Sequence, residues 1–234
     1  MINTPLIPVP LVVEVVKEIK PESILDIGCG FGRYGFLFRE ALDVSFQNSH
    51  SFARADWERK IDAVEVCADY ITELQKYIYN RIFIGDIIKI IDEDILGNYD
   101  IIFMGDVIEH LNRASGWRLL DWAYANANKM VVIATPSFFM SGLENDEYAI
   151  HRSLWRPADF GKFPNKKMVI LENRVLCVFL AKQNVNFYLP IFRRNPVLNS
   201  AGKYIYKIMN KNPVGIKILS LIRNVKERRY YKKF

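Results

Sequence analysis

The sequence contains few residues of the kinds that bind metal ions or form disulfides. Its 234 residues include three cysteines and three histidines. Cys29, Cys67 and Cys177 lie far apart, so the short cysteine spacings of a zinc site are absent. Each cysteine lies in or beside an apolar run. We therefore expect reduced thiols in a cytoplasmic protein and no disulfide framework.

Long hydrophobic runs are also missing. No uninterrupted apolar segment approaches the roughly 20 residues that are needed to span a bilayer. Residues 1–10 carry three prolines and no basic flank, which argues against a signal peptide. No internal repeat is visible. The composition, with 50% hydrophobic and 13% aromatic residues, fits one domain with a modest addition.

Acidic residues are scarce at one end of the chain. Residues 184–234 contain twelve lysines and arginines and a single acid, Glu227, so their net charge is +11. Residues 1–183 carry a net charge of −5. We therefore expect a domain at 1–183 and a basic extension at 184–234. An asymmetry of this size indicates a surface that binds anions.

The first 183 residues alternate between strand-like and helix-like patterns. The expected strands are Ser23–Asp26, Ile61–Val66, Ile82–Ile84, Tyr99–Met104 and Met130–Ala134. The expected helices are Leu11–Lys20, Tyr34–Leu42, Ala68–Tyr79 and Leu119–Ala127. Two further strand-like runs, Lys167–Leu171 and Val175–Ala181, are separated by three residues and predict an antiparallel hairpin. The fold class is therefore α/β, with a Rossmann-like, mostly parallel sheet, helices on both faces and a terminal hairpin.

One connection is longer than usual. Residues 43–60 are polar and without clear periodicity, whereas a helix-to-strand link usually has ~2–6 residues. We expect an insertion that borders the ligand site.

The most informative segment is the glycine-rich turn after the first strand. Glycines at alternate positions allow a backbone to approach a ligand closely, and the following helix presents N–H groups there. Residues 30–35 also fit the dinucleotide pattern G-x-G-x-x-G. However, Asp26 at the end of the strand favours a cationic amino group over a pyrophosphate.

The pattern Asp26-x-Gly28-x-Gly30-x-Gly32 resembles the first motif of class I S-adenosylmethionine-dependent methyltransferases. The resemblance covers about residues 10–183. It implies that Asp26 and the loop hold the methionine part of the cofactor, that Glu65 binds the ribose hydroxyls, and that Asp86 accepts from adenine with Ile87 beside the ring. The cofactor-binding residues that we expect are Asp26, Gly28, Cys29, Gly30, Gly32, Glu65, Val66, Asp86, Ile87 and Asp106.

A nicotinamide enzyme is the competing interpretation of the glycine-rich turn. Glu65 lies far beyond the ~20 residues expected of a dinucleotide site, but the insertion accounts for the excess in either case. The segment Asp106-Val-Ile-Glu109-His110-Leu111 separates the two better. It resembles an element common in small-molecule and some RNA methyltransferases. The N/D-P-P-Y motif of amino-methylating branches is absent, which disfavours N-methylation of adenine or glutamine.

His110 is the candidate base for a hydroxyl acceptor, because imidazole titrates near neutral pH. A packing or capping role for Glu109 and His110 is an equally open alternative. A Glu and a His also hold a metal in the small-RNA 2′-O-methylating branch, but that branch uses further histidines. This chain has only His50, His110 and His151, so we expect no metal site.

Residues 151–160 resemble the H-x-S-x-W-x-x-x-D-F segment of many bacterial methyltransferases of unassigned substrate. The resemblance implies a position over the acceptor pocket. His151 is then a second acid or base, and Glu109 and Arg152 are acceptor contacts. We expect Trp155 and Phe160 to belong to the core.

The basic extension predicts two amphipathic helices, one ending before Pro213 and one after it. We expect them to lie on an anionic membrane surface at the inner face of the membrane. Packing on the domain and RNA binding remain as alternatives. The predicted activity is O-methylation of a small-molecule or glycan-like acceptor with S-adenosylmethionine as cofactor. An RNA methyltransferase and a non-catalytic cofactor-binding module are the alternatives.

Overall fold

The computed structural model describes residues 6–44, 53–139, 147–187 and 189. The two predicted basic helices of the extension lie outside the described residues, as does the middle of the predicted 43–60 insertion. Within the described part of the chain, none of the helices has the length and apolar character required to cross a membrane.

The described residues form one mixed sheet in the order β3-β2-β1-β4-β5-β7-β6. Neighbours from β3 to β5 pair in parallel, whereas β7 pairs antiparallel with both β5 and β6. The strands are β1 (Ser23–Ile27), β2 (Lys60–Glu65), β3 (Ile82–Ile84), β4 (Tyr99–Gly105), β5 (Ala127–Pro136), β6 (Lys166–Leu171) and β7 (Val175–Ala181). The expected fold class is confirmed, including the terminal hairpin.

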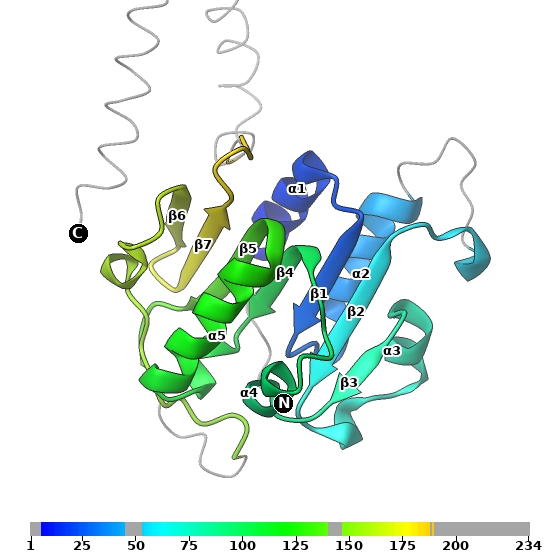
Figure 1. The fold of residues 1–234 in the computed structure, drawn as a ribbon, viewed down its shortest axis with the longest axis horizontal. Coiled ribbons are helices and arrows are strands. Elements are labelled where there is room, and N and C mark those ends of the chain that lie inside the picture. Colours follow the sequence, from blue (N-terminus) through cyan, green and yellow to red (C-terminus); the bar gives the residue numbers. More distant parts are fainter. Residues whose placement is uncertain (1–5, 45–52, 140–146, 188, 190–234) are drawn as a thin grey trace, which may run out of the picture. The chain divides into compact units, whose positions relative to one another are not determined.

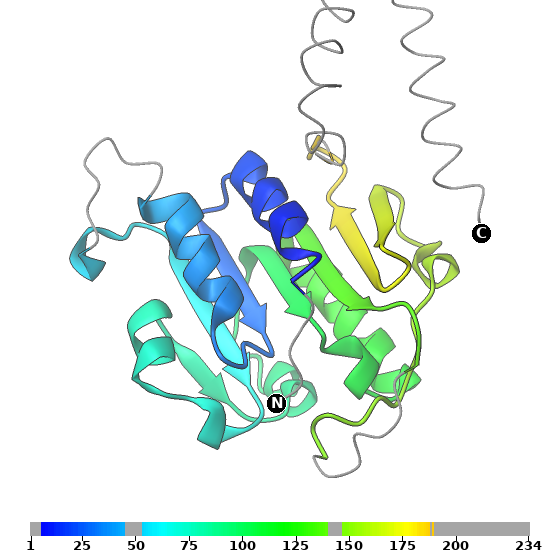
Figure 2. The same cartoon turned by 180° about the vertical axis from the view of Figure 1, so that it is seen from behind.

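Helices cover both faces of this sheet. They are α1 (Val9–Ile19), α2 (Arg33–Arg39), α3 (Glu73–Ile78), α4 (Ile87–Asp92) and α5 (Arg113–Asn126). Figure 1 shows α4 and α5 in front of the sheet, and the reverse view in Figure 2 shows α1 and α2 in front of the opposite face. Burial on both faces explains why β4 and β7 are almost wholly apolar runs.

The predicted helix at Ala68–Tyr79 is wrong in its first half. Residues 68–70 form a short 3-10 turn, and α3 begins only at Glu73. Thr72 breaks the pattern because it is the N-cap, and it forms a reciprocal capping box with Gln75. The helical periodicity is continuous in the sequence, but the Thr72 hydroxyl caps the backbone at this point, so a separate helix begins there.

Two other boundaries also depend on capping side chains. α4 was not predicted, and its first turn is capped by Asp86, whose side chain accepts a hydrogen bond from the amide of Ile88. α5 begins six residues before the predicted start at Leu119, because Asn112 caps it at Ser115.

Candidate functional site

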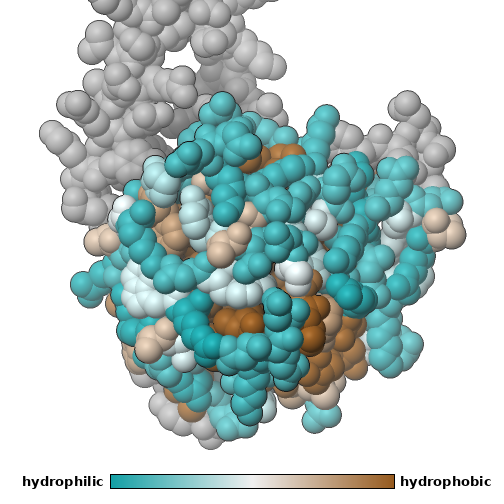
Figure 3. Space-filling view, in the orientation of Figure 1, coloured by the Kyte–Doolittle hydropathy of each residue, from teal (hydrophilic) through white to brown (hydrophobic). Residues whose placement is uncertain are grey.

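A cavity of about 670 Å³ lies where β1, β2, β3 and β4 end. In an open α/β sheet, this edge is where ligands bind. Figure 3 shows hydrophobic surface gathered on the lower part of the front face, where these strands end. Val66 and Ile84, at the ends of β2 and β3, are among the exposed apolar residues. The cavity volume is in the range of small-molecule and cofactor sites.

The glycine-rich turn forms one wall of the cavity. Gly28 and Gly30 line it, with φ angles of 71° and 49°, in the left-handed region that favours glycine. Gly28 has a second reason to be glycine, because an added Cβ would lie 2.6 Å from Cγ2 of Val107. The turn is fixed to β2 by the Gly28 amide, which donates to the Val64 carbonyl at 2.8 Å.

Glu65 lies at the same wall, at the end of β2. Its side chain is buried, and one carboxylate oxygen accepts from the Gly30 amide at 2.8 Å while the other accepts from the Cys67 amide at 3.1 Å. A carboxylate has about four acceptor positions, so two amides orient Glu65 without saturating it. The structure therefore brings Glu65 and the glycine-rich turn together, as the sequence led us to expect.

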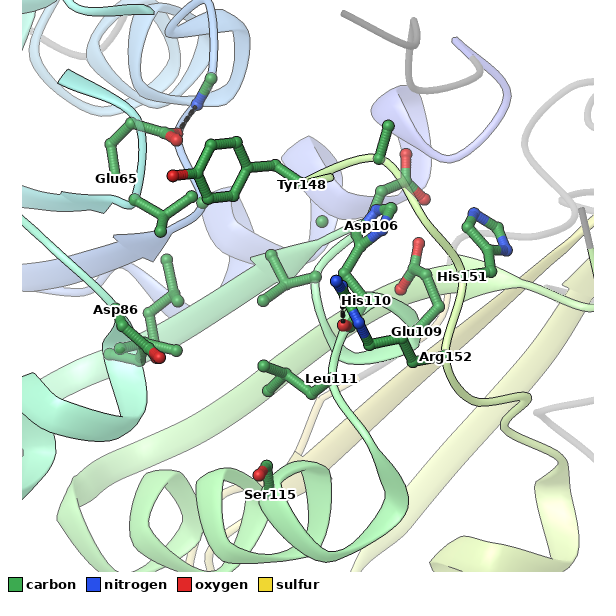
Figure 4. Close-up of a pocket in the computed structure, with 18 of the residues that line it drawn as sticks. Glu65, Asp86, Asp106, Glu109, His110, Leu111, Ser115, Tyr148, His151 and Arg152 are labelled. Atoms are coloured by element: carbon green, nitrogen blue, oxygen red, sulfur yellow. Dashed lines mark hydrogen bonds between the residues drawn. The ribbon is translucent and has the colours of Figure 1, made fainter. Parts of the chain in front are cut away.

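The other predicted adenosine residues also line the cavity. Val66, Asp86 and Ile87 are all part of the lining. One carboxylate oxygen of Asp86 already accepts the hydrogen bond that caps α4. Figure 4 shows Glu65 and Asp86 on the same side of the cavity.

Three predicted cofactor residues do not line the cavity: Asp26, Cys29 and Gly32. Asp26 lies behind the glycine-rich turn, where it is 2% exposed and accepts a 2.5 Å hydrogen bond from the Tyr79 hydroxyl. Burial, the largest cause, raises the pKa of Asp26 to about 7. Gly32 caps α2, and the thiol of Cys29 is buried with its pKa raised, again mainly by burial. These three residues shape the turn from behind.

Tyr79 reaches Asp26 across α2 because of a glycine. A Cβ at Gly35 would lie 2.3 Å from Cζ of the Tyr79 ring. The glycine that completes the dinucleotide pattern is therefore required for side-chain packing.

Gln75 does not line the cavity but supports it, and it was not singled out from the sequence. It is fully buried, and its amide nitrogen donates to the carbonyls of Gly30, at 2.8 Å, and Tyr70, at 2.6 Å. Tyr70 itself lines the cavity. The Thr72-x-x-Gln75 spacing of the capping box was the available signal. Gln75 thus connects α3 to the backbone of the glycine-rich turn.

The opposite end of the cavity contains the residues that follow β4. Asp106 lines the cavity with a φ of 52°, an unusual value for a residue with a Cβ, and its amide donates to the Ala134 carbonyl at 2.8 Å. Glu109 also lines the cavity and is 1% exposed. One oxygen of Glu109 accepts from the Thr135 hydroxyl at 2.9 Å. Burial and then the negative charge of Asp106 raise the pKa of Glu109.

His110 and His151 meet beside Glu109. Their ring centroids are 5.1 Å apart in an edge-to-face arrangement, and both residues line the cavity. Nδ1 of His110 lies 3.2 Å from the Ile150 carbonyl. A carbonyl oxygen only accepts, so Nδ1 carries the proton and Nε2 carries the lone pair in the neutral ring. Burial and then His110 lower the pKa of His151, which favours its neutral form.

Main-chain and side-chain hydrogen bonds hold the two histidines together across 41 residues. The amides of Arg152 and Ser153 donate to the Glu109 carbonyl at 2.7 and 3.0 Å. The Ser153 hydroxyl and the Trp155 indole both donate to the Ile108 carbonyl at 3.0 Å. Trp155 and Phe160 are buried, as expected of core residues.

Arg152 lines the cavity, but its guanidinium is already engaged. It donates to the carbonyls of His110, at 3.0 Å, and Glu147, at 3.1 Å. Figure 4 shows Arg152 beside Glu109 and His110, with Tyr148 extending toward the Glu65 side. Tyr148 and Arg174 also line the cavity and were not singled out from the sequence.

No protein-family model matches the sequence, and no curated protein matches it. Solved structures do resemble it. A SAM-dependent methyltransferase from Archaeoglobus fulgidus has a TM-score of 0.55 at 14% identity, over 77% of this chain and 95% of that one. An O-methyltransferase family protein from Burkholderia thailandensis has a TM-score of 0.50 at 11% identity, over 76% of this chain and 57% of that one.

A third similar structure was determined in the presence of two small molecules. The N-terminal domain of EvdMO1, in the presence of SAH and D-fucose, has a TM-score of 0.50 at 16% identity, over 76% of this chain and 83% of that one. Identities this low establish the fold. The chain therefore has the fold of the class I S-adenosylmethionine-dependent methyltransferases.

Proposed function

We propose that this chain is an S-adenosylmethionine-dependent methyltransferase that methylates a hydroxyl oxygen of a small-molecule or glycan-like acceptor. The observation that carries the proposal is the arrangement of one cavity with two different ends. Glu65 and the glycine-rich turn form one end, and Glu109, His110 and His151 form the other.

The first end suits the nucleoside part of the cofactor. The oxygens of Glu65 are oriented by two backbone amides and keep acceptor positions for a vicinal diol. Ile87 and Val66 supply apolar surface for a purine ring, and Asp86 supplies an acceptor for its amino group. Gly28 and Gly30 would hold the methionine part.

The second end suits a hydroxyl acceptor. When the cofactor is bound, it supplies an electrophilic methyl group, and the chain supplies position and proton removal. Transfer of that methyl group would break its carbon–sulfur bond as the bond to the acceptor oxygen forms, with inversion at the methyl carbon. The hydroxyl proton leaves toward the cluster of Glu109, His110 and His151, which are within reach of the same space. EvdMO1, with SAH and D-fucose, supports a glycan-like acceptor.

The test is methyl transfer from methyl-labelled S-adenosylmethionine to a panel of sugars, phenols, amines and RNA. The proposal predicts label on sugars or phenols, and its loss in His151→Ala. Label confined to amines would contradict the O-methylation proposal. Label on RNA would mean that the acceptor is RNA and not a small molecule or glycan. Tight cofactor binding without label on any acceptor of a broad panel would favour a non-catalytic module.

We also propose that the extension at 184–234 binds an anionic membrane surface, and its net charge of +11 supports this. Sedimentation of the full chain with vesicles tests it. Binding to phosphatidylserine vesicles, but not to neutral vesicles, is the expected result. Absence of binding at physiological salt would contradict it, as would stronger, salt-sensitive binding to RNA than to vesicles.

A further inference from the structure

We infer that Glu109, His110 and His151 bind a divalent metal ion at the acceptor end of the cavity. This inference rests on the proposed function for its catalytic meaning but not for its geometry. One potential ligand atom from each residue lies within 4.8 Å of the other two. Ligand atoms at ~2.0–2.2 Å from a common ion lie roughly 3–4.4 Å apart, so small side-chain rotations suffice. The sequence led us to expect no metal site, but the structure brings together three side chains that could form one.

The second observation is the state of Glu109. Its carboxylate is 1% exposed, and Oε1 receives no hydrogen bond from an N–H or hydroxyl group of the described residues. Oε2 is held by the Thr135 hydroxyl at 2.9 Å. A buried carboxylate oxygen of this kind is costly unless a cation or donor meets it. Glu109 is thus oriented by one oxygen and presents the other.

The surrounding charges favour a cation at this position. The Asp106 carboxyl lies within hydrogen-bonding range of Glu109, so two acidic groups share the site. The nearby guanidinium of Arg152 donates to the carbonyls of His110 and Glu147. A divalent ion bound by Glu109 would offset the negative charge of this pair when both carboxyl groups are ionised.

The histidines have the arrangement that metal ligands require. The Ile150 carbonyl orients the His110 ring through Nδ1, as a hydrogen-bond partner of a metal-binding histidine does. The main-chain amides of Arg152 and Ser153 donate to the Glu109 carbonyl and so hold the neighbouring His151 close to Glu109. Thr135 and Ile150, both outside the cluster, therefore orient Glu109 and His110, while His151 packs edge-to-face on the His110 ring.

The ligand set indicates the class of metal. Two imidazoles and one carboxylate suit Mn²⁺, Fe²⁺, Co²⁺ or Zn²⁺ better than Mg²⁺, which prefers oxygen ligands. Three protein ligands leave coordination positions for the acceptor. A hydroxyl oxygen bound there would have a lowered pKa, and with the ion in place its proton would pass to solvent instead of to the side chains of the cluster.

The experiment is titration of the full chain, stripped with a chelator, with Mn²⁺ alone, followed by electron paramagnetic resonance of the free ion. We expect one bound ion per chain, and affinity reduced at least tenfold in Glu109→Gln and in His151→Ala. Glu93→Gln, an exposed acid outside the cavity, should bind Mn²⁺ like the unaltered chain. Binding of S-adenosylhomocysteine by each variant shows that it is folded.

The outcomes separate the two proposals. An unaltered chain that binds S-adenosylhomocysteine but neither Mn²⁺ nor Zn²⁺ overturns the metal site alone. Equal metal affinity in all the variants also overturns it, because the ion is then held elsewhere. A chain that binds one Mn²⁺ through Glu109 and His151 but no S-adenosylhomocysteine supports the metal site and contradicts the proposed cofactor.

Discussion

Asp26 and Glu65 are both buried acids at the ends of adjacent strands, but only Glu65 lines the cavity. Glu65 lines the cavity and is oriented by two amides, whereas Asp26 lies behind the turn against the Tyr79 hydroxyl. The sequence predicts both as strand-end acids. It does not predict which one faces the cavity, because that depends on Tyr79. This residue follows Asp26 by 53 positions and packs over Gly35.

The pKa of Asp26 makes folding stability depend on pH. Its folded value of about 7 lies above the ordinary value near ~4, so the folded state binds more protons between these pH values. Stability should therefore fall as pH rises from about 4 to about 7. Asp26→Asn should flatten this slope, with a difference on the order of 2–4 kcal/mol across the window. Urea unfolding at several pH values measures it.

The control for this prediction is Asp69→Asn, which changes an exposed acid of the same region. It should leave the slope as in the unaltered chain. Equal slopes in all three proteins would mean that Asp26 is ionised normally in the folded state.

Gln75 links α3 to the glycine-rich turn. In Gln75→Ala, the carbonyls of Gly30 and Tyr70 lose their donor. We expect a loss of unfolding free energy of about 1–3 kcal/mol. Affinity for S-adenosylhomocysteine should also weaken several-fold, because the glycine-rich turn is less well held. Gln75→Glu, which keeps the shape but replaces the amide donor, should weaken the affinity similarly. A destabilised Gln75→Ala variant with unchanged affinity for S-adenosylhomocysteine would show that the glycine-rich turn keeps its conformation without Gln75.

At the scale of elements, the sequence predicts strands better than helices. β3 and β7 have the predicted bounds and β4 differs by one residue, because turn residues on either side of an apolar run leave little choice. β5 is longer than predicted, from Ala127 to Pro136. The starts of α3 and α5 depend instead on Thr72 and Asn112. A capping side chain competes with the helical pattern locally, so periodicity alone does not locate it.

The β6–β7 hairpin offers a stabilising change. Glu172 and Asn173 have φ angles of 51° and 56°, in a conformation that glycine and asparagine tolerate best. Glu172→Asn should raise the unfolding free energy by up to ~1 kcal/mol, measured by urea unfolding. The matched change Glu93→Asn, at a residue with a φ of −78°, should give no gain. Destabilisation by Glu172→Asn would mean that the Glu172 side chain makes contacts worth more than the backbone relief.

At the scale of the whole molecule, the topology brings together what the sequence keeps apart. Alternating strands and helices predict that the residues after β1, β2, β3 and β4 share one edge, and the structure confirms it. The contact of His151 with His110 does not follow from that rule. It depends on the hydrogen bonds of Ser153 and Trp155 to the Ile108 carbonyl, which no strand pattern encodes.

The proposed function requires the cavity to bind S-adenosylmethionine with Glu65 on its ribose. Calorimetric titration of the full chain with S-adenosylhomocysteine tests it most directly, with Glu65→Ala and the exposed control Asp69→Ala alongside. We expect one equivalent bound, at least tenfold weaker binding in Glu65→Ala, about 1.4 kcal/mol, and no change in Asp69→Ala. An unaltered chain that binds no S-adenosylhomocysteine, or a Glu65→Ala variant with undiminished affinity, would contradict the account.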